Sequence, residues 1–333
     1  MIPRLFGKKP KPLPVPALPD HERLSVGLVG VGSMGKHHAR LLAGIPEAKL
    51  AGIADRDLGR AEALAREHGT AAFASPDSFP PEVKAVVVAT PTPTHHEVAR
   101  SLLSRGLHVF VEKPFTERVE QAEELISLAQ AKGLVLQVGH IERFNPAVME
   151  MAKLAKEPVF IQAERLGPYD PRVSHVGVVL DLMIHDLDIV LSLVKDTVVR
   201  LDAVGGKLFS NHEDIAKATL YFSRGCRADL TASRASLKKA RKIRVFQKDA
   251  YISLDYSDKS LQVVRKKDGP LKSVLDLSVS RPKIELRDAL ETELRHFIRC
   301  VKEGRSPIVD GRHGRDALEL ALEIRREMKV YSL

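Results

Sequence analysis

The sequence predicts an α/β protein, in which a doubly wound parallel sheet is followed by an α+β domain with an open, mainly antiparallel sheet. The first half alternates short apolar runs with amphipathic stretches of helical length, which is typical of a parallel sheet covered by helices. After about residue 140, runs of alternating apolar and polar residues follow one another, as in an antiparallel meander with one polar face. We therefore expect a proline-rich tail over 1–20, a first domain over 21–140 and a second over 141–333.

The composition is that of an ordinary globular protein, with 44% hydrophobic residues among 333 and a net charge of +9. No apolar run approaches the roughly 20 residues of a membrane span, so we expect no membrane insertion. Cys226 and Cys300 lie far apart and match no metal or redox spacing, which fits a reducing cytoplasm. The positive charge favours an anionic partner. Nine Lys or Arg residues lie between Arg224 and Lys248, but no recognition helix or aromatic platform accompanies them, so nucleic acid is not expected.

Each apolar run in the first half can be assigned to one strand of the parallel sheet. The run KAVVVA at 84–89 is almost wholly apolar, as expected for a strand that is covered on both faces. The strands are predicted over 24–29, 49–54, 71–73, 84–89, 107–111 and 134–138, and the helices near 34–44, 57–68, 95–105 and 117–132.

The second half begins with a predicted helix over 177–195 and ends with two more, near 285–303 and 313–329. Between them, alternating runs predict strands at 217–223, 227–233, 242–247, 250–256 and 261–267. A sheet face this large usually packs against another subunit, so we expect a homodimer or homotetramer.

Three glycines after the first strand form the pattern G-x-G-x-x-G, at Gly30, Gly32 and Gly35. The first allows a tight turn, the second lets a pyrophosphate approach the backbone, and the third lets the helix lie against the strand. The second strand ends at Asp55, whose carboxylate can accept hydrogen bonds from a ribose and would repel a 2′-phosphate. These features predict a Rossmann domain that binds NAD, with NADP less favoured, although the neighbouring Arg56 could tolerate a 2′-phosphate.

Lys113 ends a predicted strand in the sequence Glu112-Lys113-Pro114, on the edge where Gly30, Asp55 and Thr90 also lie. Ligands of such sheets bind beyond the carboxyl ends of the strands. Proline restricts the preceding residue, so Lys113 should point into this crevice and hold a substrate hydroxyl or pass its proton. The alternative is an ordinary surface lysine near a turn.

Asp181 and His185 are four residues apart and would share one face of a helix. A carboxylate beside an imidazole fixes its tautomer, which is the arrangement of a general base with an orienting acid. The alternative is a salt-linked pair on a half-buried helix. Neither His37-His38 nor His95-His96 has further ligands for a metal, and His95 is expected to contact the cofactor instead.

The loop predicted at ERLGPYDPR precedes the Asp181 helix and carries Arg165, Tyr169 and Arg172. These side chains could bind a substrate diphosphate, and the alternative is an ordinary surface loop.

Six segments together match the pattern of a known enzyme family: GLVGVGSMGKHHAR, Asp55, ATPTPTHHEVA, GLHVFVEKPFT, GHIERFNPA and DLMIHDLD. Through them the chain resembles the Gfo/Idh/MocA oxidoreductases over residues 24–330. The resemblance implies a nicotinamide cofactor, a sugar, cyclitol or nucleotide-sugar substrate, and a catalytic set of Lys113, Asp181 and His185. The proline-rich tail is outside this pattern.

The motifs and the resemblance together define the expected site. Cofactor-binding residues are predicted to be Gly30, Gly32, Ser33, Met34, Gly35, Asp55, Arg56, Thr90, Pro91, His95, Glu112 and Lys113. Substrate-binding residues are predicted to be Lys113, Arg143, Asn145, Arg165, Tyr169, Arg172, Asp181 and His185, with no metal.

Within the family, the chain is most similar to nucleotide-sugar 3-dehydrogenases, which implies oxidation of UDP-N-acetylglucosamine at C3 and a partner aminotransferase in lipid A synthesis. His185 would be the base, Asp181 its orienter, and Lys113, ordered by Glu112, the donor to the reacting oxygen. Two alternatives remain open at this point: a dehydrogenase of myo-inositol or a free sugar, and a non-catalytic regulator that binds the dinucleotide.

Overall fold

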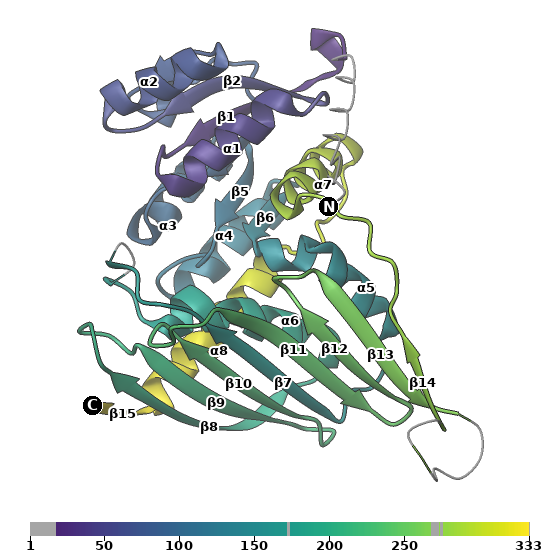
Figure 1. Cartoon of the computed structure of the whole chain (residues 1–333). Coiled ribbons are helices and arrows are strands. Elements are labelled where there is room, and N and C mark those ends of the chain that lie inside the picture. Colours follow the sequence, from purple (N-terminus) through teal and green to yellow (C-terminus); the bar gives the residue numbers. More distant parts are fainter. Residues whose placement is uncertain (1–17, 172–173, 268–272, 274–275, 333) are drawn as a thin grey trace, which may run out of the picture.

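The computed structural model of the 333-residue chain describes residues 18–171, 174–267, 273 and 276–332. Residues 1–17 of the predicted tail lie outside this part. A smaller helix-covered sheet sits above a large sheet that is curved like a trough, with helices between the two (Figure 1). None of the described helices is long and apolar enough to cross a membrane.

The first sheet has six parallel strands in the order β3-β2-β1-β4-β5-β6, which confirms the predicted Rossmann arrangement. Its central strand β4 is buried along its whole length, as its apolar sequence predicts. The strands are β1 Leu24–Val29, β2 Ala48–Ala54, β3 Ala72–Phe73, β4 Ala85–Val88, β5 His108–Glu112 and β6 Leu136–Gly139, and the helices are α1 Ser33–Gly44, α2 Leu58–His68, α3 His95–Ser104 and α4 Val119–Ala131.

The second sheet has nine strands in the order β14-β13-β12-β11-β7-β10-β9-β8-β15 and is mostly antiparallel. Its bounds are β7 Phe160–Leu166, β8 Val198–Lys207, β9 Ile215–Phe222, β10 Arg227–Ser233, β11 Ala240–Gln247, β12 Ala250–Asp255, β13 Ser260–Lys266, β14 Leu277–Ser280 and β15 Lys329–Ser332. The segment predicted as a loop at 164–172 begins inside the central strand β7, to which its first three residues, Glu164 to Leu166, belong. Strand β7 pairs parallel with β10 and antiparallel with β11.

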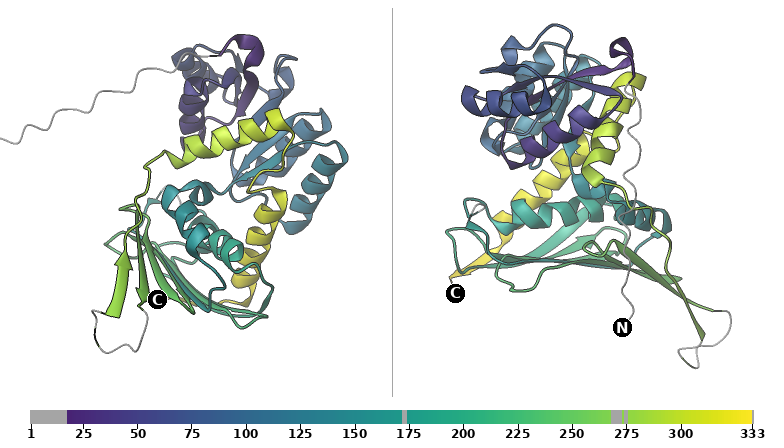
Figure 2. Two further views of the ribbon diagram at one scale, coloured as in Figure 1. Left: turned by 90° about the vertical axis from the view of Figure 1, so that its right-hand side faces the viewer. Right: turned by 45° about the horizontal axis from the view of Figure 1, so that its top comes forward.

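Helices cover one face of this sheet and leave the other face uncovered by any described element (Figure 2). The covering elements are α5 Pro146–Leu154, the π-helical turn η6 Val179–Met183, α6 Ile184–Val194 and α8 Gly311–Glu327. Their apolar side chains share one core with the inward-facing residues of the strands. Along β7 this gives strict alternation, with every second residue buried.

Helix α7 Ala289–Glu303 follows the second sheet in the chain but packs on the first domain. Leu294 and Phe297 belong to the same apolar core as β1, and the Phe297 ring lies 5.8 Å from that of Phe110 on β5. Arg295 forms an ion pair with Glu47 at 2.5 Å. The chain therefore returns to the first domain after building most of the second, which the predicted division at residue 140 does not anticipate.

Candidate active site

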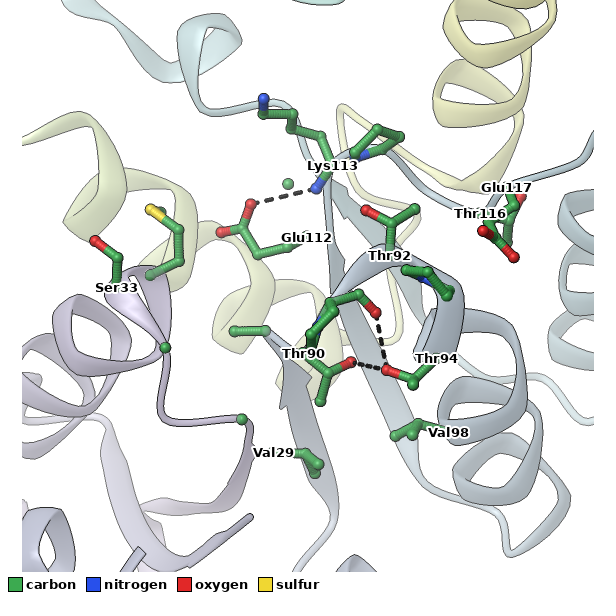
Figure 3. Close-up of a pocket in the computed structure, with 18 of the residues that line it drawn as sticks. Val29, Ser33, Thr90, Thr92, Thr94, Val98, Glu112, Lys113, Thr116 and Glu117 are labelled. Atoms are coloured by element: carbon green, nitrogen blue, oxygen red, sulfur yellow. Dashed lines mark hydrogen bonds between the residues drawn. The ribbon is translucent and has the colours of Figure 1, made fainter. Parts of the chain in front are cut away.

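A cleft of ≈ 1270 Å³ lies at the carboxyl ends of the first sheet, and Figure 3 shows the side chains that the first domain contributes to it. Residues of η6, α6 and α8 line it as well. Both domains therefore contribute to it. Of the predicted site residues, the cleft is lined by Gly30, Gly32, Ser33, Met34, Asp55, Arg56, Thr90, Pro91, Glu112, Lys113, Asp181 and His185.

The glycine loop fits a dinucleotide. Gly30 has φ +95°, and a Cβ there would press on the backbone of Ala89, while a Cβ at Gly35 would overlap the carbonyl oxygen of Gly30. At Gly32 a Cβ would meet no atom within 4 Å, so this glycine leaves free space above the backbone. No side chain caps the first turn of α1, which leaves its N–H groups for an anion.

Asp55 is held at the end of β2 by the backbone around it. Its Oδ2 accepts the N–H of Val31 at 2.9 Å, and its Oδ1 accepts the N–H of Asp57 at 3.0 Å. A carboxylate has about four acceptor positions, so it can still accept from a ribose. Arg60, which the sequence analysis did not select, also lines the cleft and donates to the carbonyl oxygen of Val31 at 3.1 Å.

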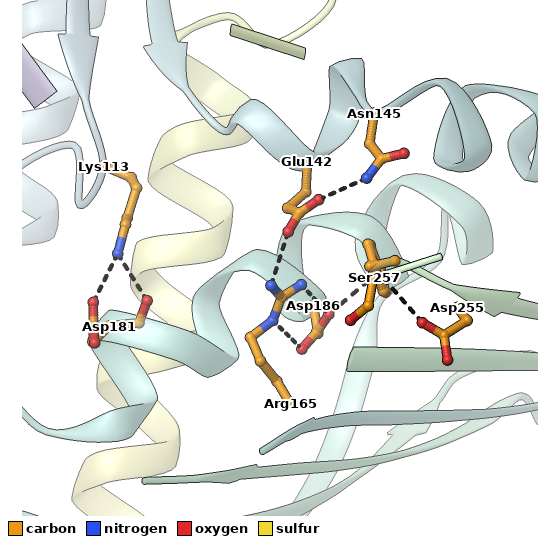
Figure 4. A network of polar contacts seen from close by, with 9 residues as sticks. Lys113, Glu142, Asn145, Arg165, Asp181, Asp186, Asp255 and Ser257 are labelled. Carbon is orange, nitrogen blue, oxygen red and sulfur yellow. Dashed lines mark hydrogen bonds and ion pairs between the residues drawn. The ribbon is translucent and has the colours of Figure 1, made fainter. Parts of the chain in front are cut away.

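Lys113 reaches across the cleft to the second domain (Figure 4). Its Nζ donates to the main-chain carbonyl oxygen of Asp181 at 2.7 Å and lies 3.1 Å from Oδ1 of the same residue. The Lys113–Pro114 peptide bond is cis. Glu112 supports this turn because its Oε2 accepts the N–H of Lys113 at 3.2 Å, while His38 Nε2 lies 2.6 Å from Oε1.

The structure corrects the expected pairing of Asp181 with His185. No hydrogen bond between them is found in the described part of the chain, because Asp181 lies in the π-helical turn η6, where a spacing of four no longer aligns two residues. Instead, Asp181 pairs with Lys113, and Nδ1 of His185 is buried without a partner. Burial and then the positive charges of Lys113 and Arg165 hold the pKa of His185 well below its ordinary value of 6.5. This imidazole is therefore neutral near pH 7, the form that a general base requires.

His95 is not in the cleft but buried behind it, contrary to the expected cofactor contact. Its Nδ1 lies 2.9 Å from the carbonyl oxygen of Pro114, and its Nε2 lies 2.8 Å from that of Thr90. It therefore ties together the two cleft-lining loops that contain Thr90 and Pro114.

Three predicted substrate-binding residues have structural roles instead, and Figure 4 shows two of them, Arg165 and Asn145. Arg165 is 2% exposed and forms hydrogen bonds with Asp186 at 2.9 and 3.0 Å and with Glu142 at 2.8 Å. It was expected in a loop, but it lies at an inward-facing position of β7.

Asn145 caps α5 by accepting the N–H of Ala147 at 3.1 Å. Arg143 pairs with Asp188 at 3.1 Å and lines a separate cavity of ≈ 1020 Å³.

Tyr169 also lies apart from the cleft. Tyr169 packs edge-on against Phe209, with ring centroids 5.5 Å apart, and Arg172 lies outside the described residues. Residues that the sequence analysis did not select form this wall instead: His175, Val176, Leu180, Leu322 and Arg325. For Leu322 and Arg325, the sequence offered only the amphipathic pattern of α8. Such a pattern predicts a helix but not which part of the protein each helix face contacts.

Buried polar groups without partners lie between the domains. Glu293 on α7 is fully buried, and neither of its carboxylate oxygens has a partner; both ring nitrogens of His140 are in the same situation. Burial, reinforced by Glu112 and Asp188, holds the pKa of Glu293 well above its ordinary value of 4.5. Burial therefore favours the protonated, neutral form of Glu293, and it also lowers the pKa of His140, which favours the neutral imidazole.

A family model described as "Oxidoreductase family, NAD-binding Rossmann fold" matches residues 24–140, and one of the GFO/IDH/MocA C-terminal domain matches residues 159–253. The UDP-N-acetylglucosamine 3-dehydrogenase of Acidithiobacillus ferrooxidans is 36% identical over 309 residues, which is 92% of this chain and 98% of that protein. A solved structure of that enzyme matches with a TM-score of 0.86 over 92% of this chain and 98% of its own.

Two relatives with lower sequence identity are named as dehydrogenases of cyclitols. The scyllo-inositol 2-dehydrogenase (NAD(+)) of Bacillus subtilis is 28% identical over 306 residues, covering 85% of this chain and 87% of that protein. The myo-inositol 2-dehydrogenase of Thermotoga maritima is 27% identical over 335 residues, covering 92% of this chain and 98% of that protein. The paired domain models and these relatives show that the chain belongs to the Gfo/Idh/MocA family of oxidoreductases and has a dinucleotide cofactor.

Proposed function

We propose that this protein is an NAD-dependent dehydrogenase that oxidises C3 of UDP-N-acetylglucosamine to a ketone. The observation that carries the proposal is the meeting of Lys113 and His185, from different domains, in the cleft that the glycine loop also lines. The substrate is suggested by the relative that is 36% identical, since the inositol dehydrogenases are less similar.

NAD⁺, when bound, supplies the acceptor for the hydride that leaves the carbinol carbon. The first turn of α1 would bind the pyrophosphate, and Asp55 the adenosine ribose. Asp55 favours NAD over NADP because its carboxylate would repel a 2′-phosphate.

His185 would remove the hydroxyl proton through a ring nitrogen that faces the cleft. Its low pKa leaves it unprotonated and able to act as the base. The Lys113 ammonium would donate a hydrogen bond to the same oxygen and stabilise its developing negative charge. The alcohol thus loses a hydride to the cofactor and a proton to His185, and a 3-keto sugar remains.

The test is incubation of the purified protein with UDP-N-acetylglucosamine and NAD⁺, with a keto-sugar aminotransferase present to remove product. We expect NADH formation and a sugar lighter by two hydrogen atoms. Parallel reactions with NADP⁺ and with myo-inositol decide cofactor and substrate class. Turnover of myo-inositol alone would establish the cyclitol alternative, and dinucleotide binding without turnover of any substrate would establish the regulator. The variant Lys113→Met should lose activity, whereas Lys329→Met, at an exposed position on β15, should retain it.

We also propose that two copies pack through the uncovered face of the large sheet and that the protein works in the cytoplasm, in lipid A synthesis. Three aromatic rings lie together on that face: Phe246 is 5.5 Å from Phe160 and 5.0 Å from Tyr251, measured between centroids. Light scattering of the purified chain would reveal the dimer or tetramer, and a monomer at all concentrations would contradict it.

A further inference from the structure

Arg325 lines the cleft and has no role in the chemistry described above. Arg325 lies in the last turn of α8, one helical turn after Leu322, and both side chains line the wall opposite the glycine loop. Helix α8 runs from the first domain to the edge of the large sheet, so its last turn belongs to the substrate side of the cleft (Figure 1). The Arg325 side chain is 38% exposed.

Arg325 is weakly paired. Among the described residues, its ion-pair partner is Glu213, with 3.9 Å between Nε and Oε1, which is at the limit of an ion pair. The same Oε1 lies 3.3 Å from the N–H of Val179, at the start of η6. Arg325 therefore faces the cleft with most of its donors available, beside the turn that carries Asp181.

The charge of the two walls differs. Four carboxylates on the cofactor side line the cleft: Asp55, Asp57, Glu112 and Glu117. On the substrate side, the lining carboxylate is Asp181, and Lys113 already neutralises it. Among the described lining residues, Arg325 is thus the cation of this wall that an anionic substrate group would meet, whereas Arg56 and Arg60 on the cofactor side stand among the four carboxylates.

We propose that Arg325 determines substrate specificity by binding the diphosphate of a nucleotide sugar, an inference that rests on the proposed function. The planar guanidinium presents a pair of parallel N–H donors that matches two phosphate oxygens. A cyclitol carries no such group, so Arg325 would contribute nothing to inositol oxidation. It acts in binding and not at the reacting carbon.

The alternative role of Arg325 is purely structural, since a cation in the last turn complements the helix dipole. The chain supplies a matched control for this alternative. Arg326 is the next residue in the same turn, its side chain is 71% exposed, and it does not line the cleft. If the dipole were all that mattered, replacing either arginine would have the same small effect.

The experiment compares Arg325→Ala, Arg325→Lys and Arg326→Ala with the wild type in the presence of NADH. Calorimetry with UDP measures binding of a nucleoside diphosphate without chemistry. We expect Arg325→Ala to weaken UDP binding by roughly ten- to hundredfold, as for loss of a charge-assisted pair. Arg325→Lys should be intermediate, Arg326→Ala should match the wild type, and NADH affinity and melting temperature should not change.

Turnover provides the second readout. The KM for UDP-N-acetylglucosamine should rise in Arg325→Ala by the same factor, with kcat close to that of the wild type. Equal UDP affinity in Arg325→Ala and the wild type would overturn the inference while leaving the proposed reaction intact. UDP binding that depends on Arg325, without any oxidation of the sugar, would overturn the proposed reaction and uphold the inference. Absence of UDP binding by the wild type would overturn the diphosphate site.

Discussion

Lys113 and Asp181 are joined across the domain interface by two contacts, because Nζ of the lysine reaches both the main-chain oxygen and the carboxylate of the aspartate. Lys113 ends a strand of the first domain, and Asp181 lies in the π-helical turn of the second. The position of the Lys113 ammonium group is therefore fixed by both domains. It leaves His185, which also lines the cleft, without a carboxylate partner.

Replacing Asp181 by Asn tests this pairing. The variant keeps the carbonyl contact to Lys113 but loses the charge, so we expect kcat to fall by about tenfold, or ~1.4 kcal/mol of barrier. The pKa of His185 should barely move, since the charges that lower it are those of Lys113, Arg165 and other cations. Kinetics and imidazole NMR titration measure both. A clear drop of the His185 pKa in the variant would instead mean that Asp181 orients the base, as the sequence first suggested.

The pH dependence of oxidation should reflect the burial of His185. Because burial and Lys113 disfavour the imidazolium, the base stays unprotonated well into the acid range. The acid limb of a plot of kcat/KM against pH should therefore lie below pH 6.5, the ordinary value for histidine. An acid limb at or above that value would count against His185 as the base.

Gly32 and Gly35 form a matched pair for testing the cofactor loop. In Gly35→Ala the new methyl group overlaps the backbone oxygen of Gly30, so helix α1 must move and we expect about 1–3 kcal/mol of destabilisation. In Gly32→Ala the methyl group meets no protein atom, so the variant should fold normally. The methyl group would, however, occupy the approach of the pyrophosphate and weaken NAD⁺ binding.

Thermal melts and titration with NADH separate these effects. Equal NADH affinity in Gly32→Ala and the wild type would show that the dinucleotide does not approach this backbone.

Glu293→Gln should raise stability at neutral pH. The folded state keeps this carboxyl protonated to higher pH than the unfolded chain does, so the unfolded state binds fewer protons and stability falls as pH rises above 4.5. Glutamine removes that loss, and the gain should disappear as the pH falls toward 4.5. Each gain of 1 kcal/mol in the free energy of unfolding should raise the melting temperature by about 2–4 °C.

The control is Glu303→Gln, an exposed position at the end of the same helix, where we expect a change within about 0.5 kcal/mol at any pH. A melting-temperature gain for Glu293→Gln that did not vary with pH would show that the buried carboxyl is not the cause.

Residues whose roles depend on nearby backbone were predictable from the sequence. Gly30, Asp55 and Lys113 each follow a buried apolar strand, and parallel strands bring their carboxyl ends to one edge. The predicted bounds of the first-sheet elements agree with the structure to within two residues for the same reason.

Residues whose roles depend on tertiary contacts were not predictable. Arg165 has the charge expected of a phosphate ligand, but the pairing of β7 with its neighbours turns it into the core, where Asp186 and Glu142 neutralise it. The spacing of four between Asp181 and His185 led to a wrong prediction of their pairing. It assumes an α-helix, whereas Asp181 lies in the wider π-helical turn η6, in which residues four apart are not aligned. Arg325 could not be selected because it is distant in sequence from every motif.

The return of α7 to the first domain limits how this protein can be divided. A fragment ended at residue 140 would contain every strand of the nucleotide-binding sheet, yet it would present to water the apolar surface that Leu294 and Phe297 cover in the whole chain. Grafting this half onto another substrate module would therefore require α7 to travel with it, as a separate piece from the far end of the chain. Truncations that remove α7 together with the helix that follows it should, by the same reasoning, impair binding of the cofactor as well as of the sugar.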